Sequence, residues 1–211
     1  MRLVLLDTSK RGSSNEARRQ REIVAYLAVE SNAEARTRIA IAHALANRLN
    51  TRWQNIYSSV FRDIDEILIP LEILREEGRL PPRRGPKALQ QEGVPYYTLT
   101  QGGMLVAVCL DQIDKAQKID VASRCIRSIE DRVLRDGLIT LINLAPSLVI
   151  RFIKEYVDYY STTNLTPLTI EKVRAALADS VNVELELLEA LMNLNKEESD
   201  RIINFLNILS E

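Results

Sequence analysis

Apolar side chains along most of this chain recur with the period of an α-helix. The clearest case covers residues 51–69, where the eight apolar side chains from Trp53 to Leu68 share an arc of about 140° when successive residues are placed 100° apart. All the polar side chains of this segment, Asp63 included, fall on the other side. Pro70 follows and lacks the backbone N–H that a further helical turn needs, so we expect the helix to end there.

The same periodicity predicts helices on both sides of this one. The two earlier helices cover residues 16–30 and 35–47, and Thr51 is placed to cap the helix that follows a short polar turn. Later in the chain, we expect Thr100 to cap a helix that begins with Gln101. The remaining helices are predicted at residues 119–135, 138–145, 147–161, 167–178, 181–193 and 196–209.

Glycine and proline gather in one segment that interrupts this helical pattern. Five of the seven glycines and five of the seven prolines fall between residues 70 and 103. Residues 71–76 and 96–99 favour short strands, and the stretch between them is too rich in helix and strand breakers to be regular. The segment therefore predicts a β-hairpin with a long irregular tip, behind which Gly102 and Gly103 allow the next helix to pack closely.

Charge differs between the two halves of the chain. Residues 1–110 hold 16 Lys and Arg against 12 Asp and Glu, whereas residues 111–211 hold 12 against 17. The first half is therefore the better candidate for contact with a polyanion. We expect a mainly α protein with an N-terminal arm at 1–14, a hairpin-containing domain at 15–110, and an all-α domain at 111–211 that dimerises or binds a partner.

The order of these elements, with a basic loop between two strands, is that of a winged helix-turn-helix domain. The stretches SSVFRDIDEILIPLEIL and YYTLTQGG resemble the recognition helix and wing of winged-helix transcription regulators, over about residues 18–110. In that family a Tyr-x-Leu-Thr-x-x-Gly stretch closes the wing, and the matching residues here are Tyr97, Leu99, Thr100 and Gly103. The chain departs from the family at Glu72, where many relatives have glycine, and in its longer wing tip. The resemblance implies a duplex-DNA-binding protein that regulates transcription.

Hydrogen-bonding side chains occupy the solvent side of the predicted recognition helix over its first three turns, where such a helix enters the major groove. These side chains are Arg52, Gln54, Asn55, Ser58, Ser59 and Arg62. The hairpin tip adds cations for the phosphate backbone or the minor groove, namely Arg79, Arg83, Arg84 and Lys87. We therefore expect double-stranded DNA as the partner, and a homodimer would hold two recognition helices about 34–36 Å apart.

A second interpretation is a winged-helix module that binds protein and not DNA, as part of a larger assembly. The near-neutral isoelectric point of about 6.0 favours it, because many dedicated DNA-binding domains are more basic. In either case we expect Trp53, Tyr57 and Phe61 to belong to the core and not to form a stacking platform.

Other classes of function find little support in the sequence. It contains no P-loop, GxSxG, HExxH or GxGxxG motif, so we expect neither enzymatic activity nor a cofactor. The single histidine, His43, and the widely spaced Cys109 and Cys125 do not make a metal site. We expect both cysteines to be small buried hydrophobes, with redox sensing as the alternative. Because no apolar run approaches the ~20 residues of a membrane span, we expect a cytoplasmic protein without membrane contact.

Overall fold

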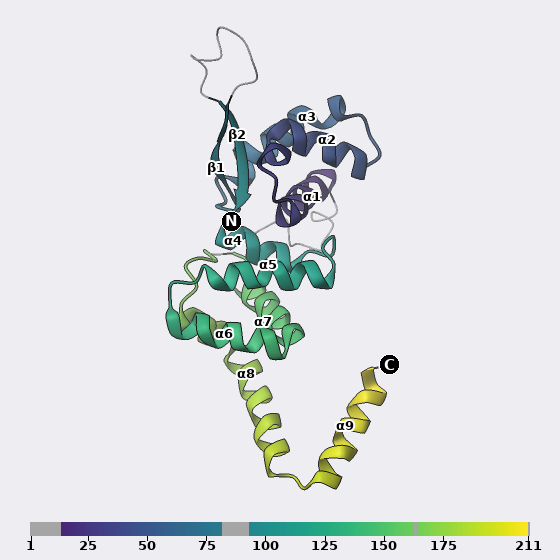
Figure 1. Ribbon diagram of the computed structural model, residues 1–211, viewed down its shortest axis with the longest axis vertical. Coiled ribbons are helices and arrows are strands. Elements are labelled where there is room, and N and C mark those ends of the chain that lie inside the picture. Colours follow the sequence, from purple (N-terminus) through teal and green to yellow (C-terminus); the bar gives the residue numbers. More distant parts are fainter. Residues whose placement is uncertain (1–13, 82–92, 163, 211) are drawn as a thin grey trace. The chain divides into compact units, whose positions relative to one another are not determined.

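The protein is mainly helical and contains one two-stranded antiparallel sheet (Figure 1). The structure is a computed structural model that describes residues 14–81, 93–162 and 164–210. The chain divides into two compact units, residues 1–170 and residues 171–211. Within the described residues, none of the helices has both the length and the apolar composition needed to cross a bilayer.

The first two helices follow the sequence prediction closely. Helix α1 spans Asn15–Val29, one residue from the predicted bounds, and is capped by the side chain of Ser14. Helix α2 spans Arg38–Arg48, so its predicted start at residue 35 is wrong. A 3₁₀ turn, Ala33–Arg36, comes first, and Thr37 then caps α2 by accepting a hydrogen bond from the N–H of Ala40.

The predicted helix at 51–69 is present, but it has two parts. Helix α3 spans Trp53–Arg62 and continues directly into a π-helix, η3, at Asp63–Leu68. The N–H of Ile69 donates to the carbonyl of Ile64, five residues back, at 3.0 Å. The prediction that Thr51 caps this helix is wrong, because Arg52 occupies the N-cap position and no side chain bonds there.

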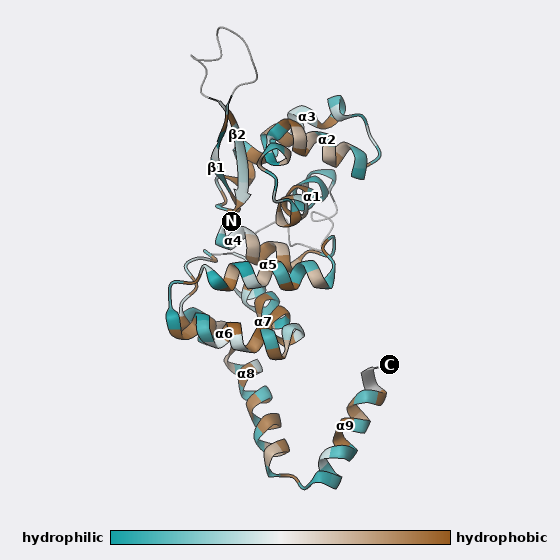
Figure 2. Ribbon diagram, in the orientation of Figure 1, coloured by the Kyte–Doolittle hydropathy of each residue, from teal (hydrophilic) through white to brown (hydrophobic). Residues whose placement is uncertain are grey.

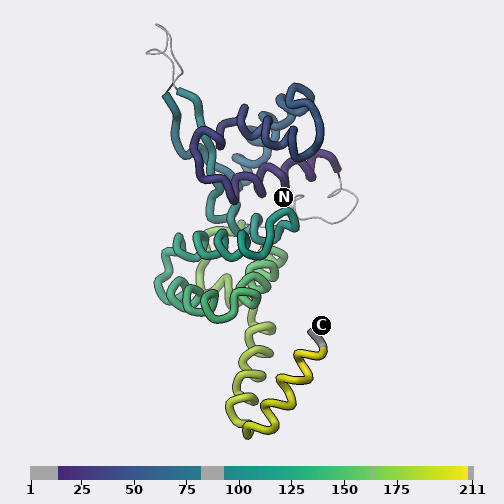
Figure 3. Tube along the Cα trace, turned by 45° about the vertical axis from the view of Figure 1, so that its right-hand side comes forward, coloured from purple at the N-terminus to yellow at the C-terminus, as the bar shows by residue number. Residues whose placement is uncertain are grey.

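The β-hairpin is confirmed, with longer strands than the sequence suggested. Strand β1 spans Leu74–Leu80 and pairs with β2, Val94–Leu99. The pairing register shifts between Glu76 and Gly78, which makes a β-bulge just beyond the predicted end of the strand at residue 76. The predicted start at residue 71 is wrong, because β1 begins at Leu74. In Figure 3 the hairpin lies beside helices α1 to α3.

Helices α4 to α7 complete the first unit. Helix α4 spans Gln101–Cys109 and is capped by Thr100, as predicted. The helix predicted at 119–135 is wrong, since the chain forms α5 at Lys115–Arg127 and α6 at Arg132–Leu144. Asp114 and Asp131 cap these two helices, which places a break between them. Helix α7 spans Pro146–Tyr159, with proline in the first turn as expected.

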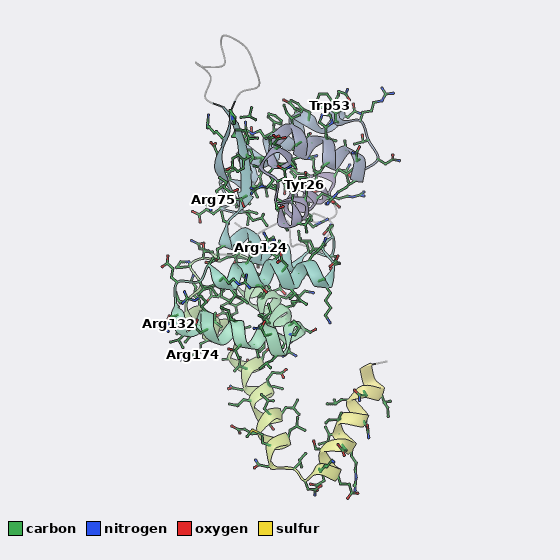
Figure 4. The ribbon with its side chains drawn as sticks, in the orientation of Figure 1. Tyr26, Trp53, Arg75, Arg124, Arg132 and Arg174 are labelled. Carbon is green, nitrogen blue, oxygen red and sulfur yellow. The ribbon has the colours of Figure 1, made fainter. Side chains whose placement is uncertain are left out.

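One core runs through the first unit. Helix α4 packs against α5 and α7 as well as against α1, so the compact unit extends past residue 110, where the sequence had placed a domain boundary. Arg124 of α5 also donates to the carbonyl oxygen of Ala28 in α1 (Figure 4). The fully buried side chains of this core include Ile23, Ile41, Leu45, Ile64, Leu74, Tyr97, Leu105 and Ile126.

The second unit consists of most of α8, Ile170–Asn193, followed by α9, Lys196–Ser210. The separate helices predicted at 167–178 and 181–193 are wrong, because α8 is continuous. No glycine or proline lies between residues 168 and 195, so nothing in the chain interrupts it. Both helices carry apolar residues between polar ones along their described lengths (Figure 2).

Candidate nucleic-acid interface

The outer side of α3 presents the polar side chains that the sequence singled out. Five of the six predicted α3 residues are exposed and Ser59 is half-buried. The exposed five are Arg52, Gln54, Asn55, Ser58 and Arg62. The opposite side of α3 holds Val60, its one fully buried residue. A single helix therefore combines an anchored side with an open face rich in hydrogen-bond donors.

A row of aromatic rings runs along the flank of α3 that faces α2. The rings of His43 and Trp53 lie 4.7 Å apart, those of Trp53 and Tyr57 5.5 Å, and those of Tyr57 and Phe61 4.3 Å. Figure 4 labels Trp53. Trp53, Tyr57 and Phe61 are half-buried, so the expectation that they belong to the core holds only in part. The contacts fix the rotation of α3 about its axis.

Asp63 lies on the inner side of this segment and not on the polar face where the helical period had placed it. The residue is fully buried, and its carboxylate accepts hydrogen bonds from the Arg19 guanidinium and, at 3.2 Å, from the Gln20 amide of α1. The sequence prediction was wrong because it counted Asp63 by polarity alone. The local pattern does not indicate that α1 places an arginine and a glutamine next to the Asp63 carboxylate.

A second ion pair neutralises the next carboxylate along the chain. Arg38, in the first turn of α2, bonds to the carboxylate of Asp65, and its guanidinium lies 5.3 Å from the ring centres of both Phe61 and Tyr97. Two of the acidic residues that follow α3, Asp63 and Asp65, are thus each paired with an arginine. Glu66 is exposed beyond them.

Arginine also joins the hairpin to the helices. The guanidinium of Arg36 lies 2.6 Å from the carboxylate of Glu77 in β1 and 5.3 Å from the ring centre of Tyr96 in β2. Thr37 forms an isolated β-bridge with Tyr96. The middle of the hairpin is therefore held against the residues just before α2, which fixes the position of the described strands relative to α3.

Of the four cations predicted for the hairpin tip, the structure describes only Arg79. Arg79 is exposed and pairs with Glu76 on the same strand at 2.7 Å. Arg83, Arg84 and Lys87 lie outside the described residues. On α3 itself, Arg62 stands 3.9 Å from Glu16, whereas Arg52 has no ion pair within the described part of the chain.

Charge within the described part of the first 110 residues is balanced. Residues 14–81 and 93–110 hold ten Lys and Arg and ten Asp and Glu. The excess of cations in this half comes wholly from residues 1–13 and 82–92, which hold six cations and two carboxylates. Long-range attraction of a polyanion would therefore depend on those two segments.

Cys125 is buried, as expected, whereas Cys109 is half-buried. Burial raises the pKa of the Cys125 thiol to about 12, and burial together with the nearby Asp158 raises the pKa of Cys109 to about 12. A thiol with such a pKa is almost wholly protonated at neutral pH, which disfavours redox sensing because the thiolate is the reactive form. Across the described residues, no three His, Cys, Asp or Glu side chains are grouped so as to hold a metal ion.

Sequence reasoning did not find the side chains that support α3 from behind. Arg19, Gln20, Arg36 and Arg38 come from α1 and from the start of α2, in stretches where arginine is frequent. Their spacing in the sequence does not predict which carboxylate each one contacts, since all the partners are 27 to 44 residues away.

No protein-family model, no curated protein and no solved structure matches this chain. The winged-helix resemblance therefore stays a prediction from the residues.

Proposed function

We propose that this protein binds duplex DNA as a transcription regulator, with the outer face of α3 in the major groove and the cations at 79–87 on the phosphate backbone or in the minor groove. The observation that carries the proposal is the exposed row of Arg52, Gln54, Asn55, Ser58 and Arg62 on a helix anchored from the other side. Guanidinium and amide groups make the bidentate contacts that distinguish base pairs in the major groove.

The surroundings of α3 suit this role. Carboxylates next to a DNA-binding helix would repel phosphate, and here Asp63 and Asp65 are each neutralised by an arginine. Arg36 pairs with Glu77 of the hairpin, so the described strands keep a defined position relative to α3. A homodimer would add a second copy of this surface and so extend the DNA site.

Selection from a randomised duplex library tests the proposal. We expect the wild type to enrich a defined sequence, and a Gln54→Ala/Asn55→Ala/Ser58→Ala variant to keep weak general binding but to lose the enrichment. These three side chains are uncharged and exposed, so their removal takes away base contacts and leaves phosphate contacts intact. The control is Thr140→Ala/Asn143→Ala, which removes exposed polar groups from α6 and should leave the selected sequence unchanged.

A protein-binding module is the second candidate, and the charge balance favours it. The described residues of the first 110 carry no net charge, and at least six of their ten arginines pair with carboxylates. If no duplex is bound at low salt, the same exposed face of α3 becomes the surface to test against protein partners.

A further inference from the structure

Within the second unit, α8 and α9 leave large apolar side chains exposed. Leu177 is the only buried residue of α8, and no described side chain of α9 is buried. Helices of this length gain most of their stability from packing an apolar face, and an isolated helix of about 15 residues is marginal in water. We therefore expect another surface to pack against the exposed apolar side chains of the second unit.

The apolar residues of α8 form two stripes. Both stripes have the spacing i, i+4, i+7, i+11, which keeps a row of side chains along one side of a helix. The first stripe is Val181, Leu185, Leu188 and Met192, and the second is Val183, Leu187 and Ala190, with Leu194 just past the end of the helix at Asn193. At 100° per residue the two stripes lie about 160° apart. One neighbouring helix cannot cover both, so α8 is built for two neighbours.

The exposed side chains offer enough area for a stable interface. Ten large apolar residues of α8 and α9 are 42% to 85% exposed, among them Met192 at 85% and Ile208 at 71%. If a whole residue of this size exposes on the order of 170 Å² in an extended chain, these ten leave roughly 900 Å² uncovered. A standard interface buries about 800 Å² on each partner.

We propose that a second copy of this chain covers these stripes, so that the α8–α9 segments of two copies form a four-helix bundle. Each α8 would then have two helices of the other copy as its neighbours, since α8 and α9 of one chain do not pack extensively against each other. The exposed part of α8 from Val181 to Asn193 has a length similar to that of α9, about 20 Å against about 22 Å at 1.5 Å per residue, as helices of one bundle require. Two copies related by a two-fold axis close such a bundle without leaving a stripe open.

Two of the three carboxylates between residues 181 and 193 do not oppose this arrangement. Glu186 and Glu189 share a face with Asn182 and Asn193, away from either seam. They would remain in water on the outside of the bundle, where like charges repel weakly and salt screens them. The third, Glu184, is half-buried and lies on the other side of the helix, beside Leu188.

Sedimentation velocity of the full chain without DNA tests this inference independently of the proposed DNA binding. The monomer mass is 24.0 kDa, and we expect a species of about 48 kDa at micromolar concentration. Leu185→Lys/Leu188→Lys places two charges in the first stripe and should reduce the mass to that of one chain. The matched control is Val133→Lys/Leu144→Lys, because these α6 residues are 73% and 78% exposed and lie outside the stripes.

Three results would overturn the inference: a wild type that sediments as one chain at 50 µM or so, a first-stripe variant that stays dimeric, or a control that dissociates. Leu185→Met/Leu188→Met keeps the stripe apolar and should remain dimeric, which separates loss of the interface from damage to α8. If the lysine variant also loses helical circular dichroism beyond what the 41 residues 171–211 can contribute, the second-stripe variant Val183→Lys/Leu187→Lys replaces it, with the same masses expected.

Discussion

Gly103 lies so close to the backbone of Ile73 that a Cβ atom at Gly103 would stand 2.1 Å from the Ile73 carbonyl oxygen. Thr100 binds both segments: its N–H donates to that same carbonyl oxygen at 3.0 Å, and its side chain accepts a hydrogen bond from the N–H of Gly103 at 3.0 Å. The glycine therefore lets α4 begin directly behind the start of β1. At the adjacent Gly102 the nearest atoms would be 3.6 Å from a Cβ, an ordinary contact distance.

Replacing Gly103 by alanine should lower the free energy of unfolding by about 3 kcal/mol, because the methyl group meets backbone and not a movable side chain. Gly102→Ala is the matched control, with a change within about 1 kcal/mol and in the stabilising direction where helix propensity dominates. Urea denaturation followed by circular dichroism measures both. Equal effects of the two substitutions would show that α4 does not approach β1 as described.

Glu72 has a positive φ of 55°, a left-handed conformation that favours glycine. This is the position where the sequence departs from winged-helix regulators, many of which have glycine there. We expect Glu72→Gly to raise the free energy of unfolding by on the order of 0.5–1 kcal/mol, because relief of the backbone strain outweighs the added freedom of the unfolded chain. Glu66→Gly, at an exposed residue without positive φ, should instead be destabilising, and a loss of stability in both variants would contradict the assignment.

The buried pair of Arg19 and Asp63 should be far more important for stability than the exposed pair of Arg38 and Asp65. Asp63→Ala leaves the Arg19 guanidinium without its carboxylate, and we expect a loss of about 3–5 kcal/mol. Asp65→Ala removes the partner of a half-exposed arginine and should cost about 1 kcal/mol or less. Thermal unfolding compares the two, and similar midpoints would mean that the π-helix does not depend on α1.

Stability should fall as the pH rises above about 9. Burial raises the pKa of Cys109 and Cys125 from 9.0, and that of Tyr97 from 10.0, to about 12 in each case. The folded state therefore holds these protons more tightly than the unfolded state does, so their stabilising contribution is complete below pH 9 and is lost between pH 9 and pH 12. Urea denaturation at pH 8, 9, 10 and 10.5 measures the slope, which Cys125→Ala should reduce. If Cys125→Ala leaves the dependence of stability on pH unchanged, the Cys125 thiol is not shielded from water in the folded state.

The sequence predicted the elements where the local pattern alone decides the structure. The apolar stripe of 51–69 and the threonine before Gln101 define a helix and a cap without help from distant residues. The failures are of another kind. Asp63 is polar yet buried because α1 brings Arg19 to it, and the bulge at Gly78 extends a strand that local breakers seemed to end. Both depend on contacts between segments far apart in sequence, which periodicity does not report.

The candidate site was predictable to a similar degree. Exposure of five α3 side chains followed from the helical period, since the period fixes which side packs inward. The arginines that neutralise Asp63 and Asp65 did not follow, because their partners come from other elements.

Fluorescence anisotropy of a random-sequence 30-base-pair duplex, measured over a series of salt concentrations, tests DNA binding most directly. We compare the wild type with Arg83→Ala/Arg84→Ala/Lys87→Ala, and use Arg127→Ala, an exposed arginine of α5, as the control. If DNA binding is the function, the wild type binds with micromolar affinity, its log–log salt slope is about 2–3 units steeper than that of the triple variant, and the control matches the wild type. No binding at low salt, or a slope that the triple variant leaves unchanged, would contradict the proposed contact between this segment and phosphate.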